Sequence, residues 1–295
     1  MSLPAFRFSG AQAVLTGAAS GMGEQMAHQL AERGAHVVLV DRDAERLAAV
    51  ADAVRRGHPG QTVHTEVADL ADLGGLDALA ERILAAAPEV SLLLNNAGIA
   101  AGGGFTDLSA AEFDQVMAVN FHAPVVLTRL LLPALRRTPG SHVVNVSSLF
   151  GLIAFPGQSA YASSKFALRG FSEVLRVELE PHGVGVSTIH PGGIRTRIAE
   201  TALIAASASE EESRAGRETF ARLLTFPADR AAEQILTAVE RRRARVLIGM
   251  SAVVPDLVAR VFPTHYAAVL RRLRPGASRR REAAAPREEG RHVAA

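Results

Sequence analysis

The sequence predicts an α/β fold, in which a doubly wound parallel sheet of about seven strands carries helices on both faces within a single domain. Short apolar runs alternate with longer segments of helical periodicity from the N-terminus onward, and this alternation requires crossover connections between parallel strands. The 295 residues, 48% of them hydrophobic, provide enough apolar material for one large core.

The expected strands are short runs rich in Val, Leu and Ile, and Gly, Pro or Asn residues punctuate the connections. In chain order they cover residues 13–15, 36–40, 62–67, 92–94, 141–146, 184–189 and 246–248. Helical patterns fill the connections and cover residues 24–33, 44–56, 73–87, 110–137 and 159–179. An irregular stretch, residues 194–226, follows the sixth strand, where either a lid-like insertion or a pair of surface helices is expected.

The basic charge of the chain is confined to its C-terminal end. Residues 271–295 carry eight arginines and three glutamates, a balance of +5, so residues 1–270 carry −3 of the total charge of +2. Pro and Gly interrupt this end, and it lacks the aromatic residues that stack on bases. We therefore expect a basic disordered tail at residues 275–295 and no nucleic-acid partner.

Several other function classes are excluded by composition. The chain has no cysteine, which excludes disulfides, thiolate metal sites and a cysteine nucleophile. Its histidines lack His-Glu-x-x-His spacing, so no metal site is expected, and no Gly-x-Ser-x-Gly nucleophile turn is present. No signal peptide and no run of about 20 uninterrupted apolar residues is found, which predicts a soluble, cytoplasmic protein.

A glycine-rich turn lies between the first expected strand and its helix. Gly17, Ser20, Gly21, Met22 and Gly23 belong to this turn, with the spacing Gly-x-x-x-Gly-x-Gly. Glycines there permit a tight turn and let a phosphate approach the backbone amides at a helix N-terminus. The turn predicts a dinucleotide site.

Asp41 ends the second expected strand, where a carboxylate accepts hydrogen bonds from an adenosine ribose and repels a 2′-phosphate. This position favours NAD. Arg42 next to it offers a guanidinium for a 2′-phosphate, so NADP is the alternative. Helix capping beside Asp43 is the structural alternative for Asp41.

Lys165 is the only lysine in the sequence and stands four residues after Tyr161. On a helix these two residues share a face. A nearby ammonium stabilises phenolate, so we expect Lys165 to lower the pKa of Tyr161 toward neutrality and to make it a general acid or base. An exposed helix carrying both residues by chance is the alternative.

Together these motifs resemble the short-chain dehydrogenase/reductase family, over roughly residues 10–249, and the resemblance implies a Rossmann-like fold. The motifs occur in the family's order and on the expected elements. They are the glycine turn, Asp69-Leu70, Asn95-Asn96-Ala97-Gly98, Asn120, Ser148, Tyr161, Lys165 and Pro191-Gly192.

The resemblance implies a catalytic role for four residues. Ser148, rather than Ser147, would orient a substrate carbonyl, and Tyr161 would donate a proton to it as hydride arrives from the nicotinamide. Lys165 would bind the nicotinamide ribose, and Asn120 would hold a water that links Lys165 to solvent. For Asn120, a locally satisfied helix residue is the alternative.

The resemblance also implies cofactor contacts beyond the glycine turn. Asp69, followed by Leu70, would contact the adenine, and Asn96, Ala97 and Gly98 would pass the adenosine ribose, although a simple turn would explain this segment too. The remaining contacts would come from the segment that binds the nicotinamide carboxamide. Its residues are Pro191, Gly192, Ile194 and Thr196.

We therefore expect an oxidoreductase that transfers hydride between NAD(H) and a secondary alcohol or ketone. The substrate would be lipophilic, because apolar residues separate Ser148 from Tyr161, although these residues could instead pack at a subunit interface. An NADP-dependent ketoreductase and a non-catalytic dinucleotide-binding sensor or scaffold are the alternatives. The resemblance implies a homodimer or homotetramer built on residues 110–137 and 159–179.

The catalytic domain would span residues 1–250, and a helical extension residues 251–274. Apolar residues recur at helical spacing in that extension, beside several arginines. Such a stripe is typical of core or subunit contacts, and contact with a membrane surface is the less favoured interpretation.

Overall fold

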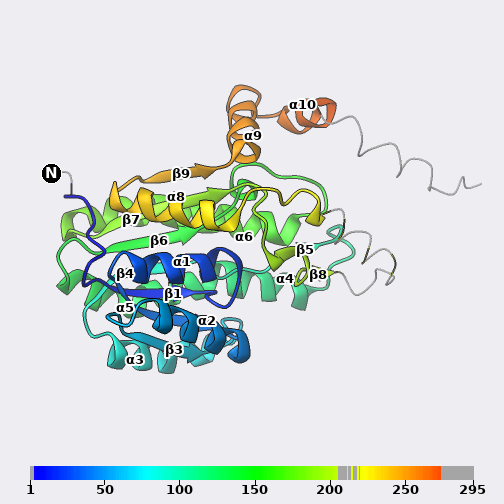
Figure 1. Cartoon of the computed structure of the whole chain (residues 1–295). Helices are drawn as coiled ribbons and strands as arrows, with labels where there is room; N and C mark the ends of the chain where they lie inside the picture. Colours follow the sequence, from blue (N-terminus) through cyan, green and yellow to red (C-terminus); the bar gives the residue numbers. More distant parts are fainter. Residues whose placement is uncertain (1–2, 205–210, 212–213, 215–217, 219, 274–295) are drawn as a thin grey trace, which may run out of the picture.

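The computed structural model describes residues 3–204, 211, 214, 218 and 220–273, and it confirms the predicted fold class (Figure 1). A seven-stranded sheet has the order β3-β2-β1-β4-β6-β7-β9, and all its pairs are parallel. Its strands are β1 (Gln12–Thr16), β2 (His36–Asp41), β3 (Val63–Val67), β4 (Val90–Asn95), β6 (His142–Val146), β7 (Gly185–Pro191) and β9 (Arg245–Ile248).

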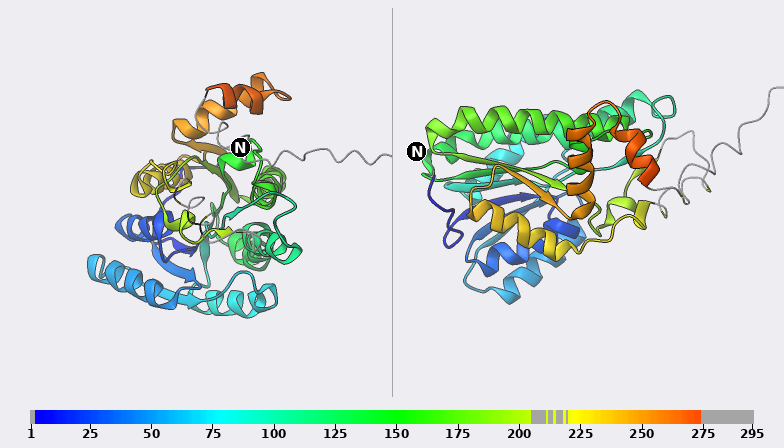
Figure 2. Two further views of the ribbon diagram at one scale, coloured as in Figure 1. Left: turned by 90° about the vertical axis from the view of Figure 1, so that its right-hand side faces the viewer. Right: turned by 90° about the horizontal axis from the view of Figure 1, so that it is seen from above.

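Helices cover both faces of this sheet, as Figure 2 shows from the side and from above. The two faces bury separate apolar clusters, with α1, α2 and α8 on one face and α3, α5 and α6 on the other. The helices of the first face are α1 (Gly21–Glu32), α2 (Ala44–Gly57) and α8 (Ala228–Glu240). Those of the second face are α3 (Leu76–Ala86), α5 (Ala123–Arg137) and α6 (Ser159–Leu179).

Side-chain caps mark the beginnings of two helices. The Asp43 carboxylate accepts a hydrogen bond from the backbone N–H of Arg46, so Asp43 and not Asp41 caps α2. Ser109 and Glu112 form a capping box at the start of α4 (Ala110–Met117). Each cap satisfies an amide that would otherwise lack a partner in the helix, which is worth about 1 kcal/mol.

The structure differs from the predicted elements in several places. The segment predicted as one helix from residue 73 begins with a 3₁₀ turn, Leu73–Gly75, and a π-helical turn, Ala118–His122, separates α4 from α5. A second parallel sheet, not predicted, pairs β5 (Ala101–Gly102) with β8 (Leu203–Ile204). These short features depend on tertiary contacts that a periodicity pattern does not contain.

Two helices follow β9 at the C-terminal end of the described chain. They are α9 (Met250–Val261) and α10 (Tyr266–Leu273), and Figure 1 shows α9 standing away from the sheet and its covering helices. The predicted lid-like insertion lies partly, and the predicted basic tail wholly, outside the described residues.

One continuous helical segment of the described chain, Ala110–Arg137, is long and apolar enough to cross a membrane by length and composition alone. Its apolar residues Leu127, Leu131 and Leu135 are fully buried in the cluster that packs against the sheet. A core helix passes the same test, and the packing of these leucines assigns the segment to the core.

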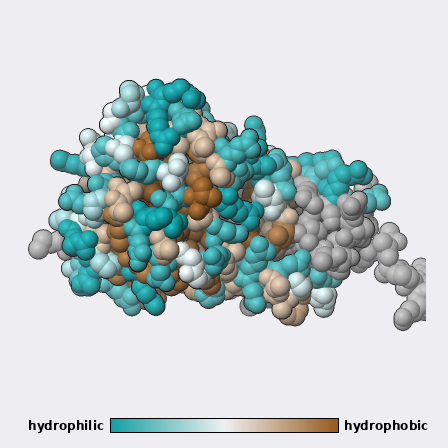
Figure 3. All heavy atoms as spheres, turned by 90° about the horizontal axis from the view of Figure 1, so that it is seen from below, coloured by the Kyte–Doolittle hydropathy of each residue, from teal (hydrophilic) through white to brown (hydrophobic). Residues whose placement is uncertain are grey.

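The surface seen from below mixes hydrophilic and apolar residues (Figure 3).

At the edge of the sheet where β6 begins, a hydrogen-bond network surrounds the buried His142. Arg242 donates hydrogen bonds to His142 Nδ1 (2.9 Å) and to the carbonyls of Pro4 (3.0 Å) and Ser141 (3.1 Å). His142 Nε2 lies 2.8 Å from Ser187 Oγ. Burial and the adjacent Arg242 charge lower the pKa of His142 to about 3. This network ties the N-terminal segment to β6, β7 and the turn before β9.

We expect the network to make stability depend on acid pH. The unfolded chain protonates His142 near its ordinary pKa of 6.5, whereas the folded protein does so only near pH 3. The contribution of His142 to the free energy of unfolding is therefore fully present above pH 6.5, and it is lost as the pH falls from 6.5 toward 3. Urea unfolding should show this loss in the wild type and a smaller loss in His142→Gln.

His64→Gln is the control, because His64 is exposed on β3. This variant should follow the wild type. If His142→Gln and the wild type lost the same stability in acid, His142 would not be the cause of that loss.

Candidate active site

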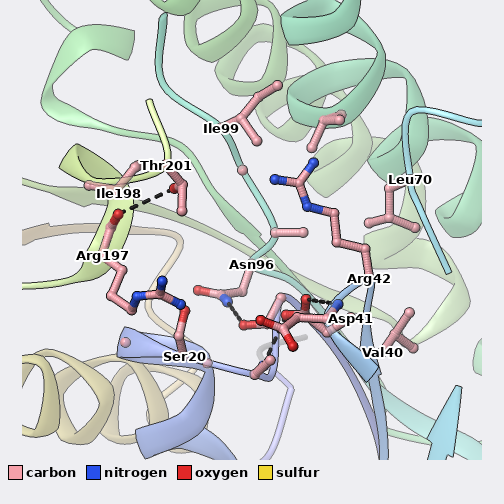
Figure 4. A pocket seen from close by; sticks show the side chains of 18 of the residues that line it. Ser20, Val40, Asp41, Arg42, Leu70, Asn96, Ile99, Arg197, Ile198 and Thr201 are labelled. Carbon is pink, nitrogen blue, oxygen red and sulfur yellow. Dashed lines mark hydrogen bonds between the residues drawn. The ribbon is translucent and has the colours of Figure 1, made fainter. Parts of the chain in front are cut away.

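A pocket opens at the carboxyl ends of β1, β2 and β4, where the strand order changes direction. In open parallel sheets this crevice is the usual ligand site. Thirteen of the predicted cofactor residues line it, as Figure 4 shows for several of them. They are Gly17, Ser20, Gly21, Met22, Gly23, Asp41, Arg42, Asp69, Leu70, Asn96, Ala97, Gly98 and Thr196.

The glycine turn is folded so tightly that its glycines leave no room for side chains. A Cβ on Gly23 would overlap the carbonyl of Gly17, and a Cβ on Gly17 would lie 2.8 Å from the Ala97 Cα. Gly17 also has a φ of +67°, in the region that favours glycine. The Asn96 amide fastens the turn by donating to the carbonyls of Thr16 (3.0 Å) and Gly17 (3.1 Å).

The start of α1 is available to an anion. Ser20 precedes the helix as its N-cap residue, but its side chain makes no capping hydrogen bond. The first backbone N–H groups of a helix lack partners within it and carry the positive end of its dipole. A glycine cradle at such a terminus fits the pyrophosphate of a dinucleotide.

Asp41 is held in place at the end of β2 by backbone amides. Its Oδ2 accepts from Ala19 N (2.9 Å) and its Oδ1 from Asp43 N (3.1 Å). Arg42 and Arg46 line the same pocket, and Figure 4 shows the Arg42 side chain directed across it toward Ile99. The lining of the pocket thus includes the fixed Asp41 carboxylate together with the Arg42 and Arg46 guanidinium groups, of which Arg46 lies 3.4 Å from Asp43.

Tyr161 and Lys165 lie together on α6, as their spacing predicts, and both are buried. The Lys165 Nζ is 5.8 Å from the centre of the Tyr161 ring. The expectation that the pKa of Tyr161 falls toward neutrality is wrong for this arrangement, because burial of the phenol outweighs the effects that lower it. Burial raises the pKa of Tyr161, and its hydrogen bond with the Ser148 side chain offsets this only in part. Burial also lowers the pKa of Lys165 to about 8.

Asn120 and Lys165 meet beside Gly98. A Cβ on Gly98 would lie 3.2 Å from both Asn120 Oδ1 and Lys165 Nζ. Lys165 donates to the Val146 carbonyl at 3.0 Å, while Asn120 exchanges hydrogen bonds with the backbone of Ile99. The π-helical turn Ala118–His122 carries Asn120 at this point. Asn120 is therefore satisfied locally, next to the lysine.

The two serines after β6 have different partners. Ser147 Oγ donates to the Lys165 carbonyl at 2.9 Å, whereas Ser148 Oγ accepts from the Phe150 N–H at 3.1 Å and lies near Tyr161. His190 Nδ1 lies 3.1 Å from the Ser148 carbonyl oxygen. His190 is fully buried, burial lowers its pKa to about 4, and a neutral imidazole can donate this bond. Sequence reasoning missed His190, because nothing in a strand pattern reveals such a contact.

Of the cofactor residues predicted from the last residue of β7 onward, only Thr196 lines the pocket. Its Cγ2 is 2.8 Å from the position that a Cβ on Gly21 would take. Pro191, Gly192 and Ile194 lie outside the lining, in the segment that Ser251 Oγ contacts through the Gly193 N–H (3.1 Å). The lining also includes residues that the sequence reasoning did not propose. Among these are Arg46, Ile99, Val119, Arg197, Ile198 and Thr201.

The comparisons with known proteins agree with this geometry. The family model described as short chain dehydrogenase matches residues 11–205. The chain belongs to the short-chain dehydrogenase family. A Mycobacterium tuberculosis protein named as an oxidoreductase, SadH, is 38% identical over 88% of this chain and 93% of its own length. Dehydrogenase/reductase SDR family member 7B of Xenopus laevis is 32% identical over 83% of this chain and 75% of its own.

Solved structures of short-chain dehydrogenases share the fold. One from Burkholderia phymatum in complex with NAD aligns with a TM-score of 0.79 and 30% identity, covering 90% of this chain and 96% of that one. Another, from Sphingobium yanoikuyae in complex with NADPH, has a TM-score of 0.71 and 26% identity, covering 95% and 98%. The protein is thus an NAD(P)-dependent dehydrogenase/reductase of this family.

A side chain on Gly23 should destroy the dinucleotide site. In Gly23→Ala the added Cβ meets the Gly17 carbonyl, so the turn must open, at a cost of about 1–3 kcal/mol in stability. Calorimetric titration with NADH and NADPH should show binding weakened by at least about ten-fold. Gly57→Ala is the matched control, since nothing lies within 4 Å of that Cβ. Unchanged binding in Gly23→Ala would contradict the cradle.

Proposed function

We propose that this short-chain dehydrogenase interconverts a lipophilic secondary alcohol and its ketone, with NAD(H) as cofactor and Tyr161 as general acid and base. The observation that carries this proposal is the placement of the buried Tyr161 and Ser148 beside each other, with the only lysine of the chain next to the tyrosine ring. A nicotinamide dinucleotide supplies or accepts the hydride. The residues of the chain then have to orient the carbonyl, deliver a proton to its oxygen during reduction and remove that proton from the alcohol during oxidation.

The two hydroxyls divide this work. Ser148 donates to the carbonyl oxygen and orients it, while Tyr161 transfers its phenolic proton to the same oxygen during reduction. Because burial keeps Tyr161 in the neutral form, it is ready to act as the acid. Lys165 is ionised at neutral pH, since its pKa is about 8, and its charge stabilises the phenolate that remains after proton transfer.

The preference for a lipophilic substrate is supported by two aromatic rings. Phe150 packs edge-on against Tyr161 with ring centres 6.0 Å apart, and against Phe155 with ring centres 6.3 Å apart. Both phenylalanines are half-buried. Leu152 and Ile153 from the same segment are buried, so Phe150 and Phe155 remain as the apolar surface next to the reacting hydroxyl.

Replacing Tyr161 tests the catalytic proposal. Tyr161→Phe removes only the hydroxyl, so ketone-dependent oxidation of NADH should fall by at least about 100-fold, while calorimetric NADH binding should be retained. The other tyrosine, Tyr266, offers the control Tyr266→Phe, which should remain active. Wild-type rates in Tyr161→Phe would refute the proposal. Binding without turnover in the wild type, on ketones from short polar to long apolar, would favour a dinucleotide sensor.

The preference for NAD over NADP is supported by Asp41. Its carboxylate is fixed by Ala19 N and Asp43 N within the pocket, where it can accept from ribose hydroxyls and repel a 2′-phosphate. Arg42 and Arg46 would favour such a phosphate if the carboxylate were absent.

Asp41→Ser should therefore change the cofactor preference. The ratio of kcat/KM for NADPH to that for NADH should rise by at least about ten-fold, because one repulsion is removed and two guanidinium groups remain. The exposed Asp52, on α2, provides the control Asp52→Asn. A ratio that stays constant in Asp41→Ser would show that the carboxylate does not select the cofactor.

We also infer that two copies of the chain pair through α6. Phe166, Val174 and Val177 are 39%, 58% and 60% exposed on this helix, and the open space at Gly170 lies between them. Their spacing places them along one face. A smooth apolar face on a long helix is typical of close helix pairing between subunits.

The mass in solution tests this dimer. The double variant Val174→Glu/Val177→Glu places two carboxylates on the paired face, and light scattering should show half the mass of the wild type. Val67→Glu, at a similarly exposed position on β3, should keep the wild-type mass. An unchanged mass in the double variant would exclude α6 as the interface.

A further inference from the structure

A buried histidine from the neighbouring strand holds the backbone of Ser148. The pairing of β6 with β7 extends to Val146 opposite Ile189, and the Ser147 N–H then donates to the Ile189 carbonyl at 2.8 Å. One residue further on, His190 Nδ1 lies 3.1 Å from the Ser148 carbonyl oxygen. The imidazole thus continues the connection between these two segments where the backbone ladder ends.

The direction of this hydrogen bond follows from the charge state of His190. The ring is fully buried, and burial lowers its pKa to about 4, so it is neutral at neutral pH. A neutral imidazole has one N–H, and a carbonyl oxygen can only accept, so Nδ1 carries the proton and donates it. Nε2 is then an acceptor. It is buried and has no hydrogen-bond partner within the described part of the chain.

Stability alone does not account for a histidine at this position. A buried polar atom without a partner costs free energy of folding. A leucine side chain of similar size would avoid that cost, and the Ser148 carbonyl would still accept from the Gly151 N–H at 3.0 Å. Departures of this kind from the most stable choice are typical of functional sites.

The bond from His190 restricts the Ser148 side chain as well as its carbonyl. Ser148 Oγ accepts from the Phe150 N–H at 3.1 Å, so Oγ, the carbonyl and the turn that follows are connected to one another. The bond from Gly151 lies within this turn and cannot fix the turn relative to the sheet. His190 ties its beginning to β7, and Arg169 of α6 donates to the Gly151 carbonyl at its end, at 3.4 Å.

We propose that His190 is a positioning residue for the reaction, whose imidazole holds the Ser148 carbonyl so that Ser148 Oγ stays where it orients the substrate carbonyl. This inference rests on the proposed function, because His190 acts through Ser148. A displacement of about 1 Å at a reacting group can lower a rate by about 100-fold. His190 does not line the dinucleotide pocket, so cofactor binding should not depend on it.

Two variants of the same shape test whether the donor matters. Leucine and asparagine differ little in shape, but only the asparagine amide places an N–H donor near the position of Nδ1. With the ketone that the wild type reduces fastest, kcat should fall at least about ten-fold in His190→Leu and stay near the wild-type value in His190→Asn. Calorimetric NADH binding and the midpoint of urea unfolding should change little in either variant.

A double-mutant cycle tests whether His190 acts through Ser148. Ser148→Ala removes the hydroxyl and should lower kcat by itself. His190→Leu should then cause no further loss in the Ser148→Ala background, because the group that it positions is already absent. A ring that only supported the fold would lower kcat by the same factor in both backgrounds.

Four results would overturn the inference. They are a wild-type kcat in His190→Leu, an equal loss of kcat in His190→Leu and His190→Asn, an equal further loss in the Ser148→Ala background, and a loss of NADH binding in His190→Leu. The last two would assign His190 to the fold. The proposed function would survive all four, whereas a wild-type kcat in Ser148→Ala would overturn the role proposed for Ser148 and this inference together.

Discussion

The common direction of the seven strands is the constraint on which the candidate site depends. Because all of them are parallel, Thr16, Asp41, Asn95, Ser147 and Pro191 come to one edge of the sheet. The two edges then serve different purposes. At the amino edge, Arg242 donates hydrogen bonds to the backbone carbonyls of Pro4 and Ser141. At the carboxyl edge, the glycine turn presents backbone amides to a ligand.

Burial governs the chemistry of the candidate centre more than charge does. The Lys165 ammonium donates a hydrogen bond to the Val146 carbonyl and lies over the Tyr161 ring, 5.8 Å from its centre. Burial nevertheless has the larger effect on the pKa of Tyr161 and raises it. Burial also brings the pKa of Lys165 down to about 8. A neutral phenol can donate a proton, and a lysine whose pKa is about 8 can gain or lose one near neutral pH. Both properties suit a reaction in which a proton is transferred and then replaced.

The sequence predicted the elements whose signal is local. The strands appear as apolar runs, the turn at Gly17 and Gly23 has its spacing, and α6 begins and ends at the predicted residues because its periodicity is uninterrupted. The contact of His190 with Ser148, the π-helical turn at Asn120 and the entry of Arg197 into the pocket could not be predicted. Each depends on segments far apart in the chain approaching one another. The direction of the Tyr161 pKa was missed for the same reason, since burial is a property of the whole fold.

The chain has one lysine, and it is buried on α6 beneath Gly98. Every other basic side chain that carries a permanent charge is an arginine. Reagents that acylate or alkylate amines therefore find no lysine amine on the surface. Lys165 has a pKa low enough to react once it is reached. An amine-selective reagent can thus address a single lysine, and the mass of the protein reports whether Lys165 becomes accessible.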